Sequence, residues 1–270
     1  MKKFWKKTSL FLVTAAMTVS APLMAWALEH DIVILHTNDI HCGINDNIGF
    51  AGLAQIKKDA LARTPNVALV DAGDAIQGAP IGKLSRGLAV VDIMNYLGYD
   101  FCIPGNHEFD YGMDRFMELV PLQRAGYYCA NFVYAGNNKQ VLPGYKIMQY
   151  EDTKVAFVGA STPESLTTST PTFFQNEKGQ YIYSFCEDKS GSKLYKQLQK
   201  NVDKARKDGA DYVFIVGHLG MDGTTPQWSS ESVAKNTQGV DAVIDGHSHE
   251  RFTRMVKNKV GKDVLLAQTG

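Results

Sequence analysis

The alternation of short apolar runs with longer amphipathic ones is the feature that most restricts the fold of this 270-residue chain. Some apolar runs have the length and composition of buried strands; they are residues 31–36, 67–70, 101–103, 127–130, 155–159, 212–216, 242–244 and 264–267. Helical patterns lie between them, at residues 53–63, 90–97, 113–125 and 193–207. Strands that alternate with helices predict an α/β fold with much of the sheet parallel.

Charge and cysteine content exclude several classes of partner and site. The chain carries 28 basic and 28 acidic residues, so its net charge gives no reason to expect a nucleic-acid partner. Its 4 cysteines show no C-x-x-C spacing, which argues against a zinc ribbon or a thioredoxin motif. Cys102 and Cys129 lie in strand-like runs and are expected to be buried apolar residues. The sequence assigns no particular disulfide pairing.

The N-terminus has the pattern of a secretory signal peptide. Lysines at positions 2, 3, 6 and 7 precede an apolar stretch at 9–23, and Ala25-Trp26-Ala27 fits the small-x-small cleavage rule. The alternative is an uncleaved membrane anchor, since residues 9–28 approach the roughly 20 residues that span a bilayer. Pro22 and the cleavage site favour a signal peptide at 1–27. We therefore predict export to the periplasm, the cell surface or the medium, with no stable membrane insertion after cleavage.

Polar residues able to bind metal recur where the predicted strands end. They are Asp39, His41, Asp74, Asn106, His107, His218, His247 and His249. Ligands of α/β sheets bind just outside the carboxyl ends of the strands, so we expect these side chains to converge on one edge. Asp39 and His41, like His247 and His249, are separated by one residue. In an extended chain such residues project to the same side, which predicts that each pair faces one cavity.

Glycines next to these residues support a close approach of the backbone. Gly73, Gly105, Gly217 and Gly246 each stand immediately before a candidate ligand. Glycine permits sharp turns and close packing of backbone segments, although a single glycine at the end of a strand would carry little weight.

The ligand types predict two divalent metal ions. Carboxylate, amide and imidazole groups suit Zn²⁺, Mn²⁺, Co²⁺ or Mg²⁺, and the lack of cysteine ligands argues against a structural zinc site. The predicted ligands, with one carboxylate bridging, are about enough for two ions: Asp39, His41, Asp74, Asn106, His218, His247 and His249. The neutral side chain of Asn106 leaves net positive charge to face a phosphate. Singly, each residue is equally well explained as a turn or strand-end residue.

Five segments carry a family resemblance. They are "ILHTNDIH" (34–41), "DAGD" (71–74), "GNHEFDYG" (105–112), "GHLG" (217–220) and "DGHSHE" (245–250). In this order they resemble the 5′-nucleotidase branch of the calcineurin-like metallophosphoesterases, from about residue 31 to the C-terminus. The resemblance implies a four-layer αββα sandwich with two mixed β-sheets.

The resemblance also implies roles for the candidate residues. Asp39, His41 and His249 would bind one metal, Asn106, His218 and His247 the other, and Asp74 would bridge the two. His107 would contact the phosphate and protonate the leaving oxygen. Asp110, three residues later, would orient the imidazole of His107 and raise its pKa. The implied reaction is in-line attack of a metal-bound hydroxide on phosphorus.

The implied function is that of an exported dimetal phosphoester hydrolase acting on nucleoside 5′-monophosphates or related nucleotides, which are small-molecule substrates. Cleavage of cyclic nucleotides or UDP-sugars is an enzymatic alternative, and a catalytically weak metal-binding remnant is an alternative of another class. Members of the branch continue into a second domain that binds the nucleotide, whereas this chain stops at "VLLAQTG". Residues 28–270 are thus expected to form one metallophosphoesterase domain, truncated before that nucleotide-binding domain.

Several polar residues receive only structural expectations. The segment 161–190 is rich in Thr, Ser and Pro and is expected to be a surface excursion, an insertion rather than a lid. Asp71 and Asp245 are expected either to hydrogen-bond ligand histidines or to cap the backbone. His36 is expected to be structural, and Asn38 and Glu108 to form local hydrogen bonds.

Overall fold

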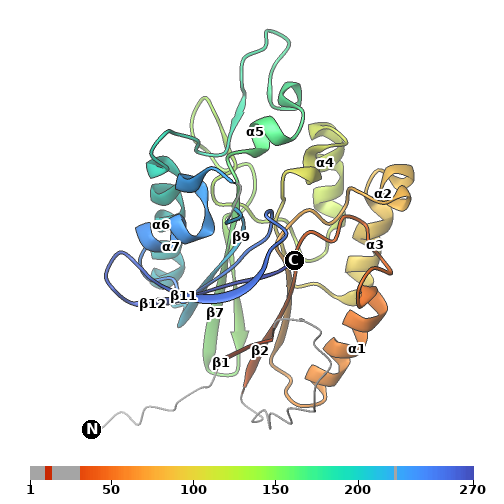
Figure 1. The fold of residues 1–270 in the computed structure, drawn as a ribbon, viewed down its shortest axis with the longest axis vertical. Coiled ribbons are helices and arrows are strands. Elements are labelled where there is room, and N and C mark those ends of the chain that lie inside the picture. The colour runs from red at the N-terminus through yellow and green to blue at the C-terminus, as the bar shows by residue number, and fades with distance from the viewer. Residues whose placement is uncertain (1–9, 14–30, 222–223) are drawn as a thin grey trace.

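The computed structural model describes residues 10–13, 31–221 and 224–270 (Figure 1). Most of the predicted signal peptide, residues 1–9 and 14–27, lies outside the described residues. Its described part, Leu10–Val13, forms a strand that pairs in parallel with residues 32–35. Among the described residues, no helix has the length and apolar character needed to cross a membrane.

The described chain alternates strands with helices, as the sequence predicts. The strands are β1 (Leu10–Val13), β2 (Ile32–Thr37), β3 (Val67–Asp71), β4 (Phe101–Cys102), β5 (Val133–Tyr134), β6 (Tyr145–Tyr150), β7 (Thr153–Ser161), β8 (Tyr183–Ser184), β9 (Tyr212–His218), β10 (Ala242–Ile244), β11 (Arg251–Lys257) and β12 (Asp263–Thr269). The α-helices are α1 (Gly49–Leu61), α2 (Pro80–Ser85), α3 (Leu88–Leu97), α4 (Met113–Leu119), α5 (Ser165–Thr168), α6 (Ser192–Lys207) and α7 (Ser230–Asn236). Short 3₁₀ turns occupy His107–Phe109, Val120–Leu122, Pro171–Phe174 and Pro226–Trp228.

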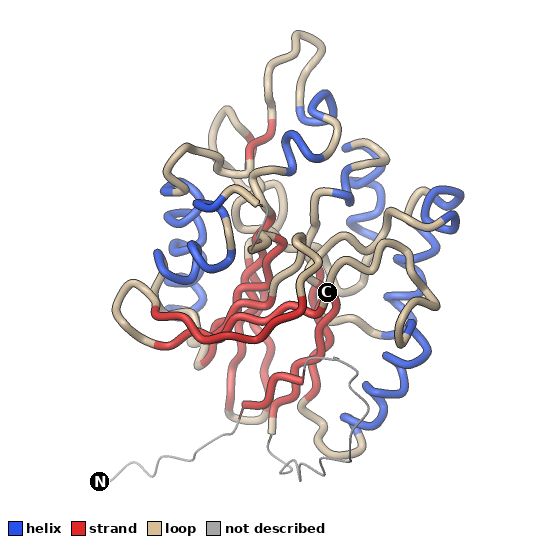
Figure 2. The backbone as a smooth tube through the Cα atoms, viewed as in Figure 1, coloured by secondary structure: helices blue, strands red, loops and turns tan. Residues whose placement is uncertain are grey.

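Two sheets form the centre of the molecule, with helices on both outer faces (Figures 1 and 2). One sheet has the strand order β1-β2-β3-β4 and is parallel in every pair. The other has the order β11-β12-β10-β9-β7-β6, with antiparallel pairs only at its two edges. The four-layer αββα sandwich is therefore confirmed, whereas within the described residues only the larger sheet is mixed. A separate two-stranded ribbon pairs β5 with β8.

Alternating side chains of the central strands fill three apolar layers. On β2, Ile32 and Ile34 pack between the two sheets, while Val33 and Leu35 pack under the helices that cover the smaller sheet. On β9, Phe214 likewise points between the sheets. Because both faces are buried, these strands read as continuous apolar runs, which is why the sequence located them.

Three local predictions differ from the structure. Residues 127–130 form no strand; only Tyr127 makes a bridge, to Cys102. The helix predicted at 113–125 ends at Leu119, because Pro121 lacks the N–H that would continue it. Segment 161–190 is no mere insertion, since Phe174 and Phe185 are fully buried against Phe109.

Candidate metal centre

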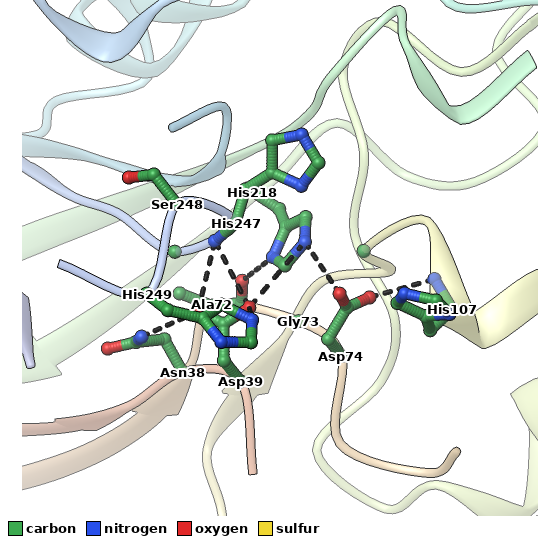
Figure 3. Close-up of polar contacts among 12 residues, drawn as sticks. Asn38, Asp39, Ala72, Gly73, Asp74, His107, His218, His247, Ser248 and His249 are labelled. Atoms are coloured by element: carbon green, nitrogen blue, oxygen red, sulfur yellow. Dashed lines mark hydrogen bonds and ion pairs between the residues drawn. The ribbon is translucent and has the colours of Figure 1, made fainter. Parts of the chain in front are cut away.

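The end of β9 and the loops that follow β2, β3, β4 and β10 bring the predicted ligands to one edge of the sheets, and five of these ligands are labelled in Figure 3. Two groups form there, and in each the ligand atoms lie within 4.8 Å of one another. One group is Asp39, His41 and His249, and the other is Asp74, His218 and His247. Residues up to 210 positions apart in sequence thus share one site. The spacing of their ligand atoms is comparable to the roughly 3.5–4 Å that separates the ions of a two-metal site.

The first group surrounds a small space bounded by two imidazoles and a carboxylate. His249 Nε2 lies 3.3 Å from Asp39 Oδ1 and 3.3 Å from His41 Nε2. His41 Nδ1 lies 3.2 Å from the carbonyl oxygen of Gln77 and can donate to it. That hydrogen bond leaves the lone pair on Nε2, the atom that faces the other two ligands.

The second group is more deeply buried. His218 Nε2 lies 2.9 Å from Asp74 Oδ2, and His218 Nδ1 lies 2.8 Å from the carbonyl oxygen of Ala72, to which it can donate. Burial opposes the charged imidazole, but the carboxylates of Asp74 and Asp39 raise the pKa of His218 to about 10. Burial also opposes the charged carboxylate, but His218 keeps the pKa of Asp74 below its ordinary value. The site therefore stabilises opposite charges in direct contact, where a cation could replace the proton.

Asp74, a member of the second group, also approaches the first. Its Oδ2 is 2.9 Å from His218 Nε2 of one group and 3.9 Å from His41 Nε2 of the other. The Asp74 carboxylate is thus within 4 Å of a predicted ligand from each group.

The environment of the Asn106 side chain indicates whether the predicted ligands fit a metal ion. Its amide oxygen is buried and has no hydrogen-bond partner among the described residues. Burial of an unpaired polar atom costs about 1–3 kcal/mol. A ligand role for this oxygen would remove that cost, so the donor set fits a divalent ion.

The ligand loops have an unusual backbone conformation. Five predicted ligands have positive φ angles: Asp39, His41, Asp74, His247 and His249. The two residue pairs were predicted to lie in extended chain, and this prediction is wrong. Both pairs follow the ends of their strands, and all four residues have positive φ angles. Non-glycine residues in this region are strained, and such strain concentrates at functional sites.

Backbone hydrogen bonds to carboxylates hold the loops together without any metal. Asp39 Oδ2 accepts from the N–H of His247 at 3.0 Å, and Asp74 Oδ1 accepts from the N–H of His107 at 2.8 Å. Buried Glu108 accepts from the N–H groups of residues 74, 75, 76 and 105, so it joins two ligand loops rather than bonding only locally. Burial and the charge of Asp74 raise the pKa of Glu108 to about 7.

The remaining polar residues at this edge serve the backbone. Asp71 accepts from the Thr37 hydroxyl and the Gly73 N–H, and Asp245 accepts from the Leu219 N–H. Neither bonds a ligand histidine in the structure, so capping is the role observed. Asn38 Oδ1 accepts from the backbone N–H of Thr269 at 3.0 Å, and this hydrogen bond ties the end of β12 to this edge.

His107 and Asp110 form a hydrogen-bonded pair beside Asp74. His107 Nδ1 lies 2.6 Å from Asp110 Oδ2, and the other oxygen of Asp110 accepts from the Ser169 hydroxyl. The hydrogen bond to Asp110 raises the pKa of His107, although partial burial opposes this. The His107 ring centroid is 5.2 Å from that of His41, so the pair borders the first ligand group.

One cavity is lined by predicted ligands, and another adjoins the His107–Asp110 pair through Asp110. One of about 500 Å³ is lined by Asp39, His41 and His249 together with Arg251. Another, of about 540 Å³, is lined by Asp110 and Ser169 and by the exposed Lys83. A small molecule placed against Asp39, His41 and His249 would therefore have room in the first cavity, and the second cavity adjoins Asp110.

One contact at the site lacks any signal in the sequence. Glu164 Oε2 lies 3.0 Å from His247 Nε2, and the two residues are 83 positions apart. The segment that carries Glu164 reads as polar excursion, and no motif or spacing marks this glutamate. Only its position just after a strand, β7, resembles that of the predicted ligands.

An αββα sandwich with paired His/Asp groups at its strand ends defines a metallophosphoesterase architecture, and the chain belongs to the calcineurin-like phosphoesterase family, whose model matches residues 32–251. That family uses a dimetal centre, in agreement with the two ligand groups.

Within the family, the chain is similar to 5′-nucleotidases. It is 28% identical to the snake venom 5′-nucleotidase of Gloydius brevicauda, over 96% of this chain and 46% of that protein. It is 30% identical to the human 5′-nucleotidase, over 87% of this chain and 41% of that protein. The crystal structure of a 5′-nucleotidase precursor from Thermus thermophilus superposes with a TM-score of 0.72 at 26% identity, covering 87% of this chain and 48% of that one. The chain spans less than half the length of these relatives.

Proposed function

We propose that this chain is the catalytic, metal-binding part of an exported phosphoesterase that removes phosphate from nucleoside 5′-monophosphates or related nucleotides. The observation that carries the proposal is the position of Asp74, in contact with His218 on one side and with the backbone of His107 on the other. This places an acid–base pair directly beside a carboxylate suited to bridge two ions. The proposal of export rests on the N-terminal sequence alone.

Each ligand group would hold one divalent ion. Asp39, His41 and His249 would bind the first, Asn106, His218 and His247 the second, and Asp74 would bind both. Two such ions supply Lewis acidity and a water-derived nucleophile at neutral pH. The buried carboxylates and the neutral amide leave the pair of ions with excess positive charge for a phosphate.

His107 would act as the general acid. Its Nδ1 is occupied by Asp110, so the proton available to a leaving oxygen is the one on Nε2. Because Asp110 raises the pKa of His107, the imidazole keeps that proton to a higher pH than a free histidine would. The backbone N–H of His107 donates a hydrogen bond to Asp74 Oδ1, and this hydrogen bond would hold the proposed acid next to the metal ligands.

The relatives favour a nucleotide as substrate without selecting one. Besides the 5′-nucleotidases, the chain is 26% identical to a Haemophilus influenzae protein named 2′,3′-cyclic-nucleotide 2′-phosphodiesterase/3′-nucleotidase. Cyclic nucleotides and UDP-sugars are therefore the enzymatic alternatives. The alternative of another class is a metal-binding remnant of low activity.

Metal content measured together with phosphate release tests these candidates. Purified protein should bind two equivalents of Zn²⁺ or Mn²⁺ by elemental analysis and release phosphate from a nucleoside monophosphate. Asp74→Ala should lose both properties and His107→Ala only turnover, whereas Asp59→Ala, an exposed helix position, should lose neither. Two equivalents without turnover on any nucleotide would favour the remnant, and failure to bind metal would refute the whole assignment.

A further inference from the structure

Glu164 comes from a segment that the proposed chemistry does not use. It follows β7, the parallel neighbour of β9, and directly precedes α5. Its carboxylate reaches back to the site, where Oε2 lies 3.0 Å from His247 Nε2. The two side chains are only 18% and 12% exposed, so the contact is largely shielded from water.

This contact determines which nitrogen of His247 is free. An imidazole nitrogen that donates its proton to a carboxylate cannot offer a lone pair to a metal. With the proton on Nε2, the lone pair lies on Nδ1, and this is the atom left for the second ligand group. His41 and His218 have the complementary arrangement, because their Nδ1 atoms face carbonyl oxygens and their Nε2 atoms face the ligands.

Glu164 is itself held in place. Its Oε1 accepts from the backbone N–H of Thr225 at 2.7 Å and from the Thr225 hydroxyl. Its second oxygen is thereby left to His247. A carboxylate fixed at both oxygens restricts the rotation of the imidazole that it contacts.

We propose that Glu164 is a positioning residue for the second metal site, acting through His247 and held by Thr225. This inference rests on the two-metal assignment proposed above. Loss of such an outer carboxylate costs about 10–100-fold in metal affinity in comparable sites. The effect should fall on the ion bound by His218 and His247 and leave the ion bound by Asp39, His41 and His249 unchanged.

The test compares Glu164→Gln and Thr225→Val with wild type. Zn²⁺ affinities for the first and second equivalents are measured by competition with a chromophoric chelator. Glu118→Gln is the matched control, because Glu118 also pairs with one side chain, that of Arg115, but is itself 62% exposed. Urea unfolding of the chelated proteins separates a loss of metal affinity from a loss of fold. The His247 resonance, identified by its absence in His247→Asn, is followed by ¹⁵N NMR on histidine-labelled protein with and without Zn²⁺.

We expect Glu164→Gln to weaken one Zn²⁺ equivalent by 10-fold or more and Thr225→Val to weaken the same one by less, with unchanged urea midpoints. In wild type, His247 should keep its proton on Nε2 while its Nδ1 resonance shifts on Zn²⁺ addition. Equal affinities in Glu164→Gln and wild type, or loss of the Nε2 proton on Zn²⁺ addition, would overturn the positioning role alone. A wild-type protein that binds fewer than two equivalents would overturn the two-metal assignment and this inference with it.

Discussion

Substitution of Gly105 by alanine should damage the site through a single methyl group. Gly105 immediately precedes Asn106, and its backbone packs against the side chain of Asp74. A Cβ atom at position 105 would lie 2.8 Å from both Cγ and the backbone N of Asp74, with Oδ1 nearer still. The neighbours that would have to move are thus the side chain of Asp74, the proposed bridging ligand, and its backbone, not the end of a flexible side chain.

The size of the displacement follows from ordinary contact distances. Carbon atoms in favourable contact lie about 3.5–4.0 Å apart, so Cγ of Asp74 would have to move by about 1 Å. A misplacement of about 1 Å in a catalytic group can cost on the order of 10²-fold in rate. Crowding of a packed site by an added methyl group costs about 1–3 kcal/mol of stability, which is too little to unfold an ordinary domain.

We therefore expect Gly105→Ala to remain folded, to bind Zn²⁺ more weakly and to release phosphate about 100-fold more slowly than wild type. The assays are urea unfolding, Zn²⁺ titration and phosphate release. Gly136→Ala is the control, because a Cβ there meets nothing within 4 Å. Activity of Gly105→Ala within threefold of the Gly136→Ala value would refute the claim that the close approach of these two loops positions Asp74.

Three further predictions concern protonation and metal. Asp110→Asn should reduce turnover most for substrates with poor leaving groups. Because Asp110 raises the pKa of His107, the activity of the variant should begin to decline at a lower pH than that of wild type. A pH–rate profile on two phosphate esters checks both. Burial lowers the pKa of His36 to about 4, so the folded state resists protonation of this side chain. The free energy of unfolding should therefore fall by up to about 3 kcal/mol as pH drops from 6.5 to 4. Urea titrations at these pH values should show a smaller fall for His36→Phe. Chelation of the metals should leave the far-UV circular dichroism unchanged while lowering the unfolding midpoint, because ions bound at 1,000 times their Kd add about 4 kcal/mol per site.

The central strands could be predicted because their sequences are apolar on both faces. β2, β3, β9 and β10 lie within two residues of the predicted runs at either end. The edge strands β6 and β11 could not be predicted in this way. Most of β11 is exposed and includes Arg and Lys, and β6 is mostly half-buried and includes Lys and Gln. An edge strand pairs on one side only, and its sequence need not exclude polar residues.

The ligand set could be predicted from position, but its geometry could not. Strand ends and residue types identified the residues that the structure gathers into two groups. The left-handed turns at Asp39 and His247 arise from tertiary contacts, such as the hydrogen bond between these two residues, which no local pattern encodes. The contact of Glu164 with His247 was invisible for the same reason, because it joins two loops that only the finished fold brings together.

The fold positions the ligand loops at this edge of the sheets. The strands are fixed by three apolar layers that do not involve the ligands, and the loops are then tied by N–H groups that donate to Asp39, Asp74 and Glu108. Strained turns and the unpaired amide oxygen of Asn106 are tolerated because that scaffold determines them. A centre assembled in this way is organised before any ion arrives, so the ordering of its loops need not be supplied by metal binding. Such preorganisation would allow ions bound as proposed to keep excess positive charge for a phosphate.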